Sequence, residues 1–245
     1  MRMKSRSIEQ IIEEQVRKWQ FSQAKSKTGV PFRPIVTISR EPGSGGNVIG
    51  ERLARRLSLD LFHQEMIHAM AKSAKVSTRL LETLDEKGLS VLDDWMAYLV
   101  DARHMWPDQY MKHLMKVIGA IGRHGGAVLI GRGANFILPP ERRFSVRVIA
   151  PVEMRAANVA RDHQVTEKEA RNRITKTDSQ RRAFIRKYFN TSIADPMHYN
   201  MVINTGSASI DGAVDAIAAF LGMTATGSAA VHAGKGPAVV SSAKP

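Results

Sequence analysis

The hydrophobic residues of the chain follow two kinds of pattern. Unbroken apolar runs, short and rich in β-branched residues, predict buried strands at 35–38, 127–130, 146–150 and 201–203, with a weaker candidate at 59–62. Longer stretches with a helical repeat separate these runs, most clearly at 152–163, 167–189 and 210–222. Because strands alternate with helices, we expect an α/β fold: a parallel five-stranded sheet in three layers, with helices on both faces.

The two ends of the chain have patterns of their own. Ser7-Ile-Glu-Gln10 matches a capping box and predicts a helix over 7–22, which we expect to precede the core rather than belong to it. The last residues are small, with two lysines and no acid, and predict disorder. The expected organisation is an N-terminal helical extension and linker over 1–30, one α/β domain over 31–223 and a disordered tail over 224–245.

Two further patterns set helix boundaries. Residues 64–124 read as helices, with a break at 88–90 and Ser90 as the cap of the helix that follows. Thr166-Glu-Lys-Glu169 forms a second capping box, so a long helix is expected to begin at 167.

Composition narrows the class of protein. With 245 residues, 43% of them apolar, the chain is long enough for one sizeable domain. The 36 Lys and Arg against 23 Asp and Glu give a net charge of +13, which indicates an anionic partner, and the absence of cysteine excludes disulfides and thiolate chemistry. Neither a secretory signal nor a membrane span is evident, so we expect a cytoplasmic protein.

A glycine-rich turn follows the first strand. Arg40 to Asn47 reads REPGSGGN, and a helical pattern begins directly after it. A strand, a glycine turn and a helix N-terminus make up a phosphate-binding loop, in which backbone N–H groups hold the anion. A plain turn between a strand and a helix is the alternative. The small residues of this turn are Gly43, Ser44, Gly45, Gly46 and Asn47.

This loop lacks its usual lysine. In G-x-x-x-x-G-K-[ST], the lysine reaches the phosphates and the hydroxyl binds Mg²⁺; Gly46 and Asn47 stand in these two positions. A phosphoryl-transferring enzyme without the lysine needs another cation, and Arg40 is the nearest candidate.

Further arginines follow later strands. Arg132 lies between two glycines directly after the run 127–130, at the sheet edge where the glycine turn also ends. The stretch 155–187 holds ten basic residues against four acidic ones, and its apolar residues make it amphipathic. It is either a solvated helix with ion pairs or a lid that closes arginines over a transferring phosphoryl group.

In this order, the motifs resemble the cytidylate kinase branch of the nucleoside monophosphate kinases, most closely the cytidylate kinase-like family. The segments that carry the resemblance are ISREPGSGG, the strand ending in GR, FSVRVIAPVEMRAANVA, ITKTDSQR and HYNMVINTGSASID, within about residues 33–222. The resemblance implies a P-loop kinase fold with a helical lid, ATP and Mg²⁺ as cofactors, and transfer of the γ-phosphoryl group to CMP, dCMP or a similar monophosphate.

The resemblance also implies roles for residues. The ATP phosphates would be cradled by the backbone N–H groups of Gly43, Ser44, Gly45, Gly46 and Asn47. Arg132 would hold the acceptor monophosphate, and residues 64–115 would close over its base. Asp178 and Arg181 match the last acid and arginine of the lid motif R-D-x-x-D-x-x-R, whose first two positions hold Ile174 and Thr175. Arg182 or Arg173 would compensate for the arginine missing at 174.

The sequence departs from established cytidylate kinases at other positions too, and alternatives stay open. Ile130 and Gly133 stand where those enzymes carry acids around the GR pair. The second hypothesis is a catalytically impaired P-loop protein that binds nucleotide as a sensor or scaffold. A nucleic-acid binder comes last, because only 6% of residues are aromatic. No histidine pair predicts a metal site, and the N-terminal helix is a candidate surface for pairing two copies.

Overall fold

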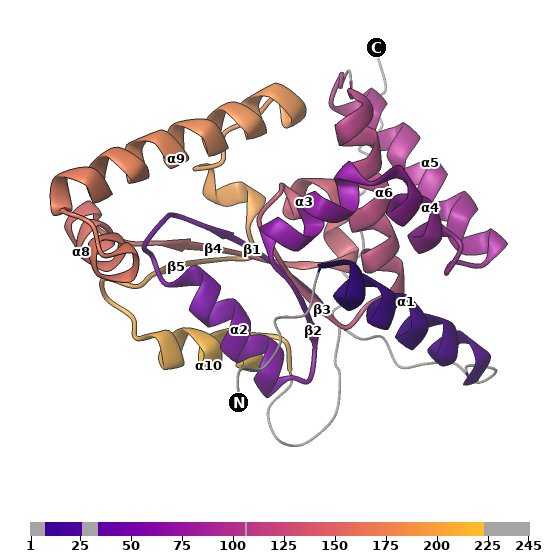
Figure 1. Ribbon diagram of the computed structural model, residues 1–245, viewed down its shortest axis with the longest axis horizontal. Coiled ribbons are helices and arrows are strands. Elements are labelled where there is room, and N and C mark those ends of the chain that lie inside the picture. The colour runs from indigo at the N-terminus through magenta and orange to yellow at the C-terminus, as the bar shows by residue number, and fades with distance from the viewer. Residues whose placement is uncertain (1–7, 26–33, 106, 223–245) are drawn as a thin grey trace, which may run out of the picture.

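The computed structural model describes residues 8–25, 34–105 and 107–222, and Figure 1 shows how they are arranged. At its centre lies a five-stranded sheet with the strand order β2-β3-β1-β4-β5, in which every neighbouring pair is parallel. The predicted parallel sheet is therefore confirmed, with the fourth strand beginning two residues before the predicted run. The strands are β1 (Ile35–Arg40), β2 (Asp60–Phe62), β3 (Ala127–Ile130), β4 (Phe144–Ile149) and β5 (Met201–Asn204).

Helices cover both faces of the sheet, as predicted. Helices α2 and α10 pack on one face, α1 and α3 to α7 pack on the other, and α8 and α9 form a helical hairpin beyond the carboxyl ends of the strands (Figure 1). The helices are α1 (Ile8–Lys25), α2 (Gly46–Arg56), α3 (Gln64–Lys72), α4 (Ala74–Leu81), α5 (Glu86–Ala102), α6 (Gln109–His124), α7 (Ala134–Ile137), α8 (Val152–His163), α9 (Glu167–Phe189) and α10 (Ile210–Phe220), with 3-10 turns at Pro140–Arg142 and Pro196–His198.

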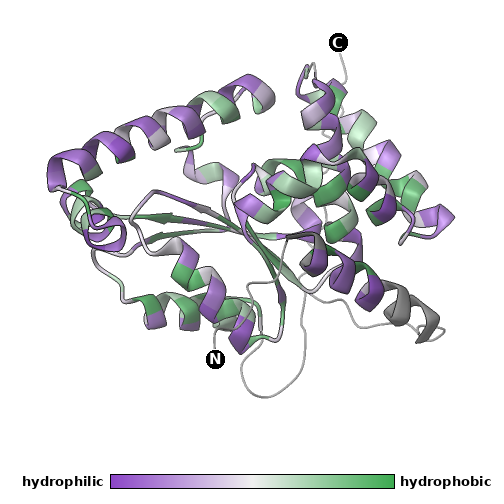
Figure 2. Cartoon of the chain, viewed as in Figure 1, coloured by the Kyte–Doolittle hydropathy of each residue, from purple (hydrophilic) through white to green (hydrophobic). Residues whose placement is uncertain are grey.

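Successive side chains of the central strands point to opposite faces of the sheet, so an apolar face and a more polar face result. On β4, Val146 and Val148 belong to the core under α2 and α10, whereas Ser145 and Arg147 point to the opposite face. Arg147 donates from Nη1 to Ser39 Oγ of β1 at 2.8 Å, so this second face is polar at the centre of the sheet. Figure 2 shows that the strands are mostly hydrophobic and that α9 is mostly hydrophilic.

Helix α1 belongs to the core, so the expectation that it lies outside the core is wrong. Ile12, Val16 and Trp19 are buried in the same cluster as residues of α3 and α6. Trp19 also stacks on His124 with the ring centroids 4.2 Å apart. These side chains recur at helical spacing, and their apolar face is covered by the chain itself. Pairing of two copies through this helix stays a prediction.

One predicted helix boundary is wrong and another is confirmed. Helix α5 runs without a break through 88–90, and its N-cap is Asp85, whose Oδ1 accepts from Gly88 N at 2.8 Å, rather than Ser90. A Cβ at Gly88 would lie 2.7 Å from that oxygen, so the glycine serves the cap and does not end a helix. Thr166 caps α9 as predicted, accepting from Glu169 N at 3.3 Å.

Most of the predicted linker and the predicted disordered tail lie outside the described residues. Among the helices that the structure describes, none combines the length and the apolar character needed to cross a bilayer.

Candidate active site

The glycine-rich loop joins β1 to α2 at the carboxyl edge of the sheet. Gly43 and Gly45 have φ angles of 75° and 77°, which favour glycine, and a Cβ at Gly43 would lie 2.4 Å from Arg155 O. Gly45 is the N-cap of α2; no side chain caps this end, and its first turn holds no acid. The first backbone N–H groups of α2 are therefore left for an anionic ligand.

Side chains from distant elements fix this loop from behind. Thr205 Oγ1 donates to Ser44 O at 2.9 Å, and Asn158 Nδ2 of α8 donates to Gly43 O at 2.8 Å. The hydroxyl of Ser44 is fully buried and donates to Glu41 O at 2.8 Å. These contacts use carbonyl oxygens and an inward hydroxyl, and Ser44 N donates to Glu41 O at 3.3 Å, so the N–H groups that point to a ligand are those at the start of α2.

Arg40 occupies the space beside Gly46. A Cβ at position 46 would lie 2.5 Å from Arg40 Cβ and 3.0 Å from Arg40 Cγ, so no side chain fits there without moving the arginine. The guanidinium donates from Nε to Asn47 Oδ1 and from Nη2 to Gln64 Oε1, both at 2.9 Å. Arg40 is 7% exposed. A buried, oriented cation thus lies where the loop lacks its lysine.

Arg40, Arg132 and Arg181 meet in a hollow of about 400 Å³, which we call the arginine hollow. Arg132 has a φ of 54° and donates from Nε to Gln64 O at 3.4 Å. A Cβ at the preceding Gly131 would lie 2.6 Å from Arg40 Nη1, so this glycine lets the two arginines approach. The predicted site residues from the first and third strands and from the lid therefore come together.

The positive charges in the arginine hollow have no carboxylate beside them among the described residues of its lining. Burial and the neighbouring Arg181 lower the pKa of Arg40 to about 9, with smaller effects of Arg132 and Arg147 in the same direction and of Glu65 in the opposite one. Burial lowers the pKa of Arg181 as well. Of the residues that the structure describes, no Asp or Glu lines this hollow. A bound anion would relieve the repulsion between these cations.

Asn135 adds an unpaired donor to the arginine hollow. It lines the hollow, is 4% exposed, and its Nδ2 has no hydrogen-bond partner among the described residues. A buried amide without a partner costs free energy, and an oxygen atom of a ligand would remove that cost.

A second hollow, the loop hollow of about 390 Å³, lies over the glycine loop. It is lined by the loop, by residues of α8 including Arg161, and by Ile210 of α10. Arg40 and Arg181 line both hollows. Two ligands bound in the two hollows would therefore meet at these two guanidinium groups.

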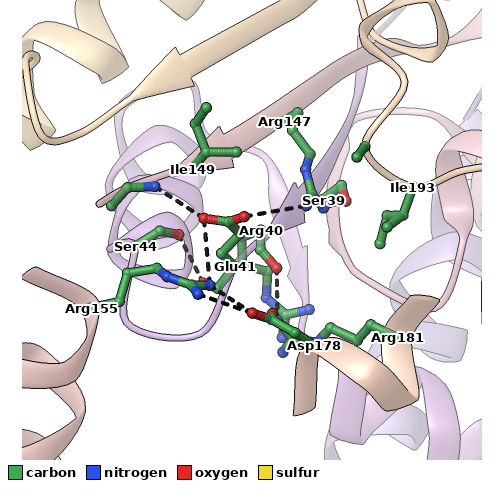
Figure 3. Close-up of polar contacts among 12 residues, drawn as sticks. Ser39, Arg40, Glu41, Ser44, Arg147, Ile149, Arg155, Asp178, Arg181 and Ile193 are labelled. Atoms are coloured by element: carbon green, nitrogen blue, oxygen red, sulfur yellow. Dashed lines mark hydrogen bonds and ion pairs between the residues drawn. The ribbon is translucent and has the colours of Figure 1, made fainter. Parts of the chain in front are cut away.

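Ion pairs tie the helical hairpin to the loop, as Figure 3 shows. Arg155 of α8 donates from Nη1 and Nη2 to Asp178 Oδ2 of α9 at 3.0 and 2.9 Å, and it lies 3.4 Å from Glu41 Oε2. Arg181 donates from Nη1 to Arg40 O at 2.7 Å (Figure 3). Glu41 also accepts from Ala150 N at 3.1 Å. The hairpin thus lies against the loop through charged contacts rather than apolar ones.

Some predicted site residues lie elsewhere. Arg182 lines neither hollow and donates to Ser179 Oγ at 3.2 Å on an exposed surface. Asp178 does not line either hollow, and it forms an ion pair with Arg155 instead. The positions of the missing acids do not suit them. Ile130 is fully buried, where an unpaired carboxylate would be costly, and a Cβ at Gly133 would lie 2.7 Å from the ring of Phe189.

The sequence reasoning missed several residues that build the site. Glu41 directly follows Arg40 in the loop motif, so its position in the sequence could have indicated that it belongs to the site. The others depend on strand register or on contacts across the fold, which no local pattern shows: Gln64, Asn135 and Arg147. Arg155 belongs to the predicted basic stretch, but its ion pairs with Asp178 and Glu41 were not predicted.

No described group of three or more His, Cys, Asp or Glu side chains is arranged to hold a metal ion. Magnesium in phosphoryl-transfer sites is held largely by substrate phosphates and water, with one or two protein oxygens. Glu41 and Asn47 both line the loop hollow and supply such oxygens. The residues present therefore fit a magnesium ion that enters with a nucleotide.

Comparisons with known proteins identify the family and the fold. Residues 35–207 match the sequence model of the cytidylate kinase-like family. The cytidylate kinase of Ignicoccus hospitalis is 24% identical over 183 residues, which cover 75% of this chain and 96% of that protein. The crystal structure of an uncharacterized protein from Eubacterium ventriosum superposes with a TM-score of 0.56 at 21% identity, covering 78% of this chain and all of that one.

Proposed function

The chain belongs to the cytidylate kinase-like family, and on that premise we propose that it is a nucleoside monophosphate kinase. It transfers the γ-phosphoryl group of ATP to CMP, dCMP or a similar monophosphate. The loop hollow takes the ATP phosphates, and the arginine hollow takes the acceptor phosphate.

One observation carries this proposal: Arg40 and Arg181 line both hollows. A phosphoryl group in transfer lies between donor and acceptor, and its charge must be neutralised on both sides. Guanidinium groups suit this task because they stay charged and bind phosphate oxygens in pairs.

The chemistry needs no protein nucleophile. An oxygen of the acceptor phosphate attacks the γ-phosphorus, while the bond from that phosphorus to the β–γ bridging oxygen breaks and its electrons leave with ADP. The attacking oxygen carries no proton at neutral pH, because the second pKa of a phosphate monoester is near 6. Positioning and charge neutralisation are then the tasks of the protein, and Arg132 holds the acceptor between Arg40 and Arg181.

A magnesium ion bound with the nucleotide would neutralise part of the charge of its phosphates. Asn47 Oδ1 and the Glu41 carboxylate are the oxygens that would hold it. Asn47 stands where related loops place a hydroxyl, and its oxygen already accepts from Arg40 Nε at 2.9 Å. Arg40 thereby fixes the orientation of the Asn47 amide.

The test is a product assay. The purified full chain is incubated with ATP and Mg²⁺ and, in separate reactions, each common ribo- and deoxyribonucleoside monophosphate, and the products are identified by mass. We expect a nucleoside diphosphate and ADP in equal amounts from at least one acceptor. ATP binding without a diphosphate product from any acceptor would instead support a nucleotide-binding sensor that has lost its chemistry.

A further inference from the structure

Gln64 lies where side chains from three strand ends meet. It is the first residue of α3, directly after β2 and the N-cap His63. Because the strand order is β2-β3-β1, the ends that carry Gln64 and Arg40 are separated by β3, which Gly131 directly follows. A Cβ at Gly131 would lie 2.6 Å from Arg40 Nη1 and 3.5 Å from Gln64 Cβ and Oε1. The absence of a side chain at position 131 therefore leaves the space in which Gln64 and Arg40 meet.

Two charged neighbours fix the orientation of the Gln64 amide. Its Oε1 accepts from Arg40 Nη2 at 2.9 Å, and its Nε2 donates to Glu65 Oε1 at 2.7 Å. Burial acts to raise the pKa of Glu65, but hydrogen bonds from Gln64 and the backbone, together with the charge of Arg40, lower it overall, so this carboxylate is ionised at neutral pH. A guanidinium group only donates and an ionised carboxylate only accepts, so the reversed amide would lose both hydrogen bonds.

The guanidinium group of Arg40 is held from two sides. Asn47 Oδ1 accepts from its Nε and Gln64 Oε1 accepts from its Nη2, both at 2.9 Å. These two contacts set the plane of the guanidinium group, because its nitrogen atoms are coplanar. Its third nitrogen, Nη1, makes no hydrogen bond with any residue that the structure describes. Arg40 therefore keeps Nη1 available to a phosphate oxygen as long as Gln64 holds Nη2.

The backbone of Gln64 holds a second arginine. Its carbonyl oxygen accepts from Arg132 Nε at 3.4 Å, so one residue contacts Arg40 through its side chain and Arg132 through its main chain. Gln64 and both arginines line the arginine hollow, whereas Glu65 does not. The Glu65 carboxylate thus supports Arg40 through the Gln64 amide, and it does not compete with a bound phosphate for the arginines.

We propose that Gln64 is a positioning residue, which keeps the guanidinium groups of Arg40 and Arg132 turned into the arginine hollow. This inference rests on the proposed kinase function and makes it more specific: it names the residue through which the cation beside the glycine loop and the cation beside the acceptor act together. The atoms of Gln64 take no part in the bond changes. A phosphoryl group in transfer gains its charge stabilisation from correctly placed cations, so a displaced Arg40 lowers the rate more than it weakens binding.

The first experiment compares Gln64→Leu with the unmodified full chain. Leucine is similar in size but has no oxygen, so Arg40 Nη2 loses its partner. With Mg²⁺-ATP and the acceptor that the unmodified protein uses best, we expect kcat to fall about 10- to 100-fold and both KM values to change less than about threefold. An unchanged kcat would overturn the inference.

The matched control is Gln15→Leu. Gln15 also donates to a carboxylate, Asp60 Oδ2 at 3.0 Å, but it lies on α1 and lines neither hollow. Losing this amide is expected to leave kcat and both KM values unchanged. A fall in kcat as large as that of Gln64→Leu would show that any lost amide contact slows the protein, and it would contradict a specific role for Gln64.

A second background separates positioning from folding. If Gln64 acts through Arg40, its substitution has little effect once the arginine is gone. We therefore expect Gln64→Leu to lower kcat less than about twofold in the Arg40→Gly protein, measured at high enzyme concentration. A structural role alone would lower kcat by the same factor in both backgrounds, and that result would refute the proposal.

A measurement without turnover separates this inference from the proposed function. The Nε–H group of Arg40 is buried and donates to Asn47, so it is suited to observation by nuclear magnetic resonance, and its signal is the one that disappears in Arg40→Gly. We expect this signal to shift in Gln64→Leu and to stay in place in Gln15→Leu.

The two readouts then give distinct outcomes. A shifted signal in a protein that forms no diphosphate from any acceptor would uphold the positioning role and refute the kinase. Diphosphate formed at the same rate by Gln64→Leu and the unmodified protein would uphold the kinase and refute the role of Gln64. A signal that does not move in Gln64→Leu overturns the inference, whatever the rates.

Discussion

At the scale of single residues, the side chain of Arg40 lies across the backbone of Gly46, where phosphate-binding loops usually carry lysine. The glycine is needed because a Cβ there would overlap Arg40 Cβ at 2.5 Å, and Val148 Cβ lies 3.3 Å away on another side. The buried Arg40 side chain therefore occupies the space that the side chain of a lysine at position 46 would need. The sequence identified Arg40 by proximity alone, but the steric link to Gly46 required the structure.

Restoring the lysine should therefore damage the protein. We expect Gly46→Lys to lower the free energy of unfolding by about 1–3 kcal/mol, since the added side chain overpacks a filled space. Urea denaturation measures this, with Val48→Lys as the control: Val48 lies two residues further along α2 and is 40% exposed, so it tolerates the same side chain. A Gly46→Lys variant as stable as the unmodified protein would show that Arg40 does not fill this space.

At the scale of elements, the hairpin of α8 and α9 meets the glycine loop through buried charges. Arg155 and Asp178 have side chains only 8% and 17% exposed, and their ion pair joins the two helices beside Glu41. The sequence predicted both helices from their periodicity and Thr166 as the cap of α9. It did not predict that Asp178 holds Arg155 instead of lining the hollow, because that depends on how the helices dock.

Breaking this ion pair should loosen the hairpin. Asp178→Asn leaves the buried Arg155 with Glu41 alone, and we expect a loss of about 3 kcal/mol in the free energy of unfolding. The matched control on the same helix is Glu169→Gln, which breaks the exposed pair with Arg173 and costs about 0.3–0.5 kcal/mol. Equal losses for the two variants in urea denaturation would argue against a buried link between the hairpin and the loop.

Helix α1 packs on α6 through a contact that makes the free energy of unfolding depend on pH. His124 of α6 stacks on Trp19 and lies 2.7 Å from Thr83 Oγ1, and burial, with a smaller effect of Arg123, lowers its pKa from 6.5 to about 4. The folded protein therefore resists protonation of this ring more than the unfolded chain does. The stability associated with the neutral ring is present above pH 6.5 and is lost as the pH falls towards 4.

The change between pH 7 and pH 5 amounts to about 2 kcal/mol, from a shift of this size at 1.36 kcal/mol per pKa unit. We expect the unmodified protein to lose this much more unfolding free energy over that range than His124→Phe, which keeps an aromatic ring against Trp19 but does not titrate. Parallel pH profiles for the two proteins in urea denaturation would mean that the ring is not held neutral by burial.

At the scale of the whole molecule, the fold was predictable because its signals are local. Apolar runs such as 127–130 and helical repeats such as 152–163 match the observed elements residue for residue. The docking of α1 was not predictable, since an amphipathic helix at a chain end looks the same whether its partner is the core or another protein. Asn135 was missed for a similar reason: its place in the arginine hollow depends on neighbours that lie far away in the sequence.

The arrangement of the whole molecule also explains how the arginines act together. The glycine loop, the GR turn and the hairpin all reach the carboxyl edge of one parallel sheet. Arg40, Arg132 and Arg181 therefore come from three elements to one hollow. The net charge of +13 is consistent with an anionic ligand, and the proposed phosphoryl transfer rests on this convergence of arginines.

The most direct test of this account is the rate of phosphoryl transfer from Mg²⁺-ATP to CMP by the unmodified protein, Arg40→Gly and the double variant Arg40→Gly/Gly46→Lys, measured side by side. If Arg40 replaces the loop lysine, Arg40→Gly lowers kcat at least about 100-fold, and the double variant, with room for a lysine, regains about tenfold. If Arg40→Gly turns over as fast as the unmodified protein, Arg40 is not the transferring cation and the account is wrong.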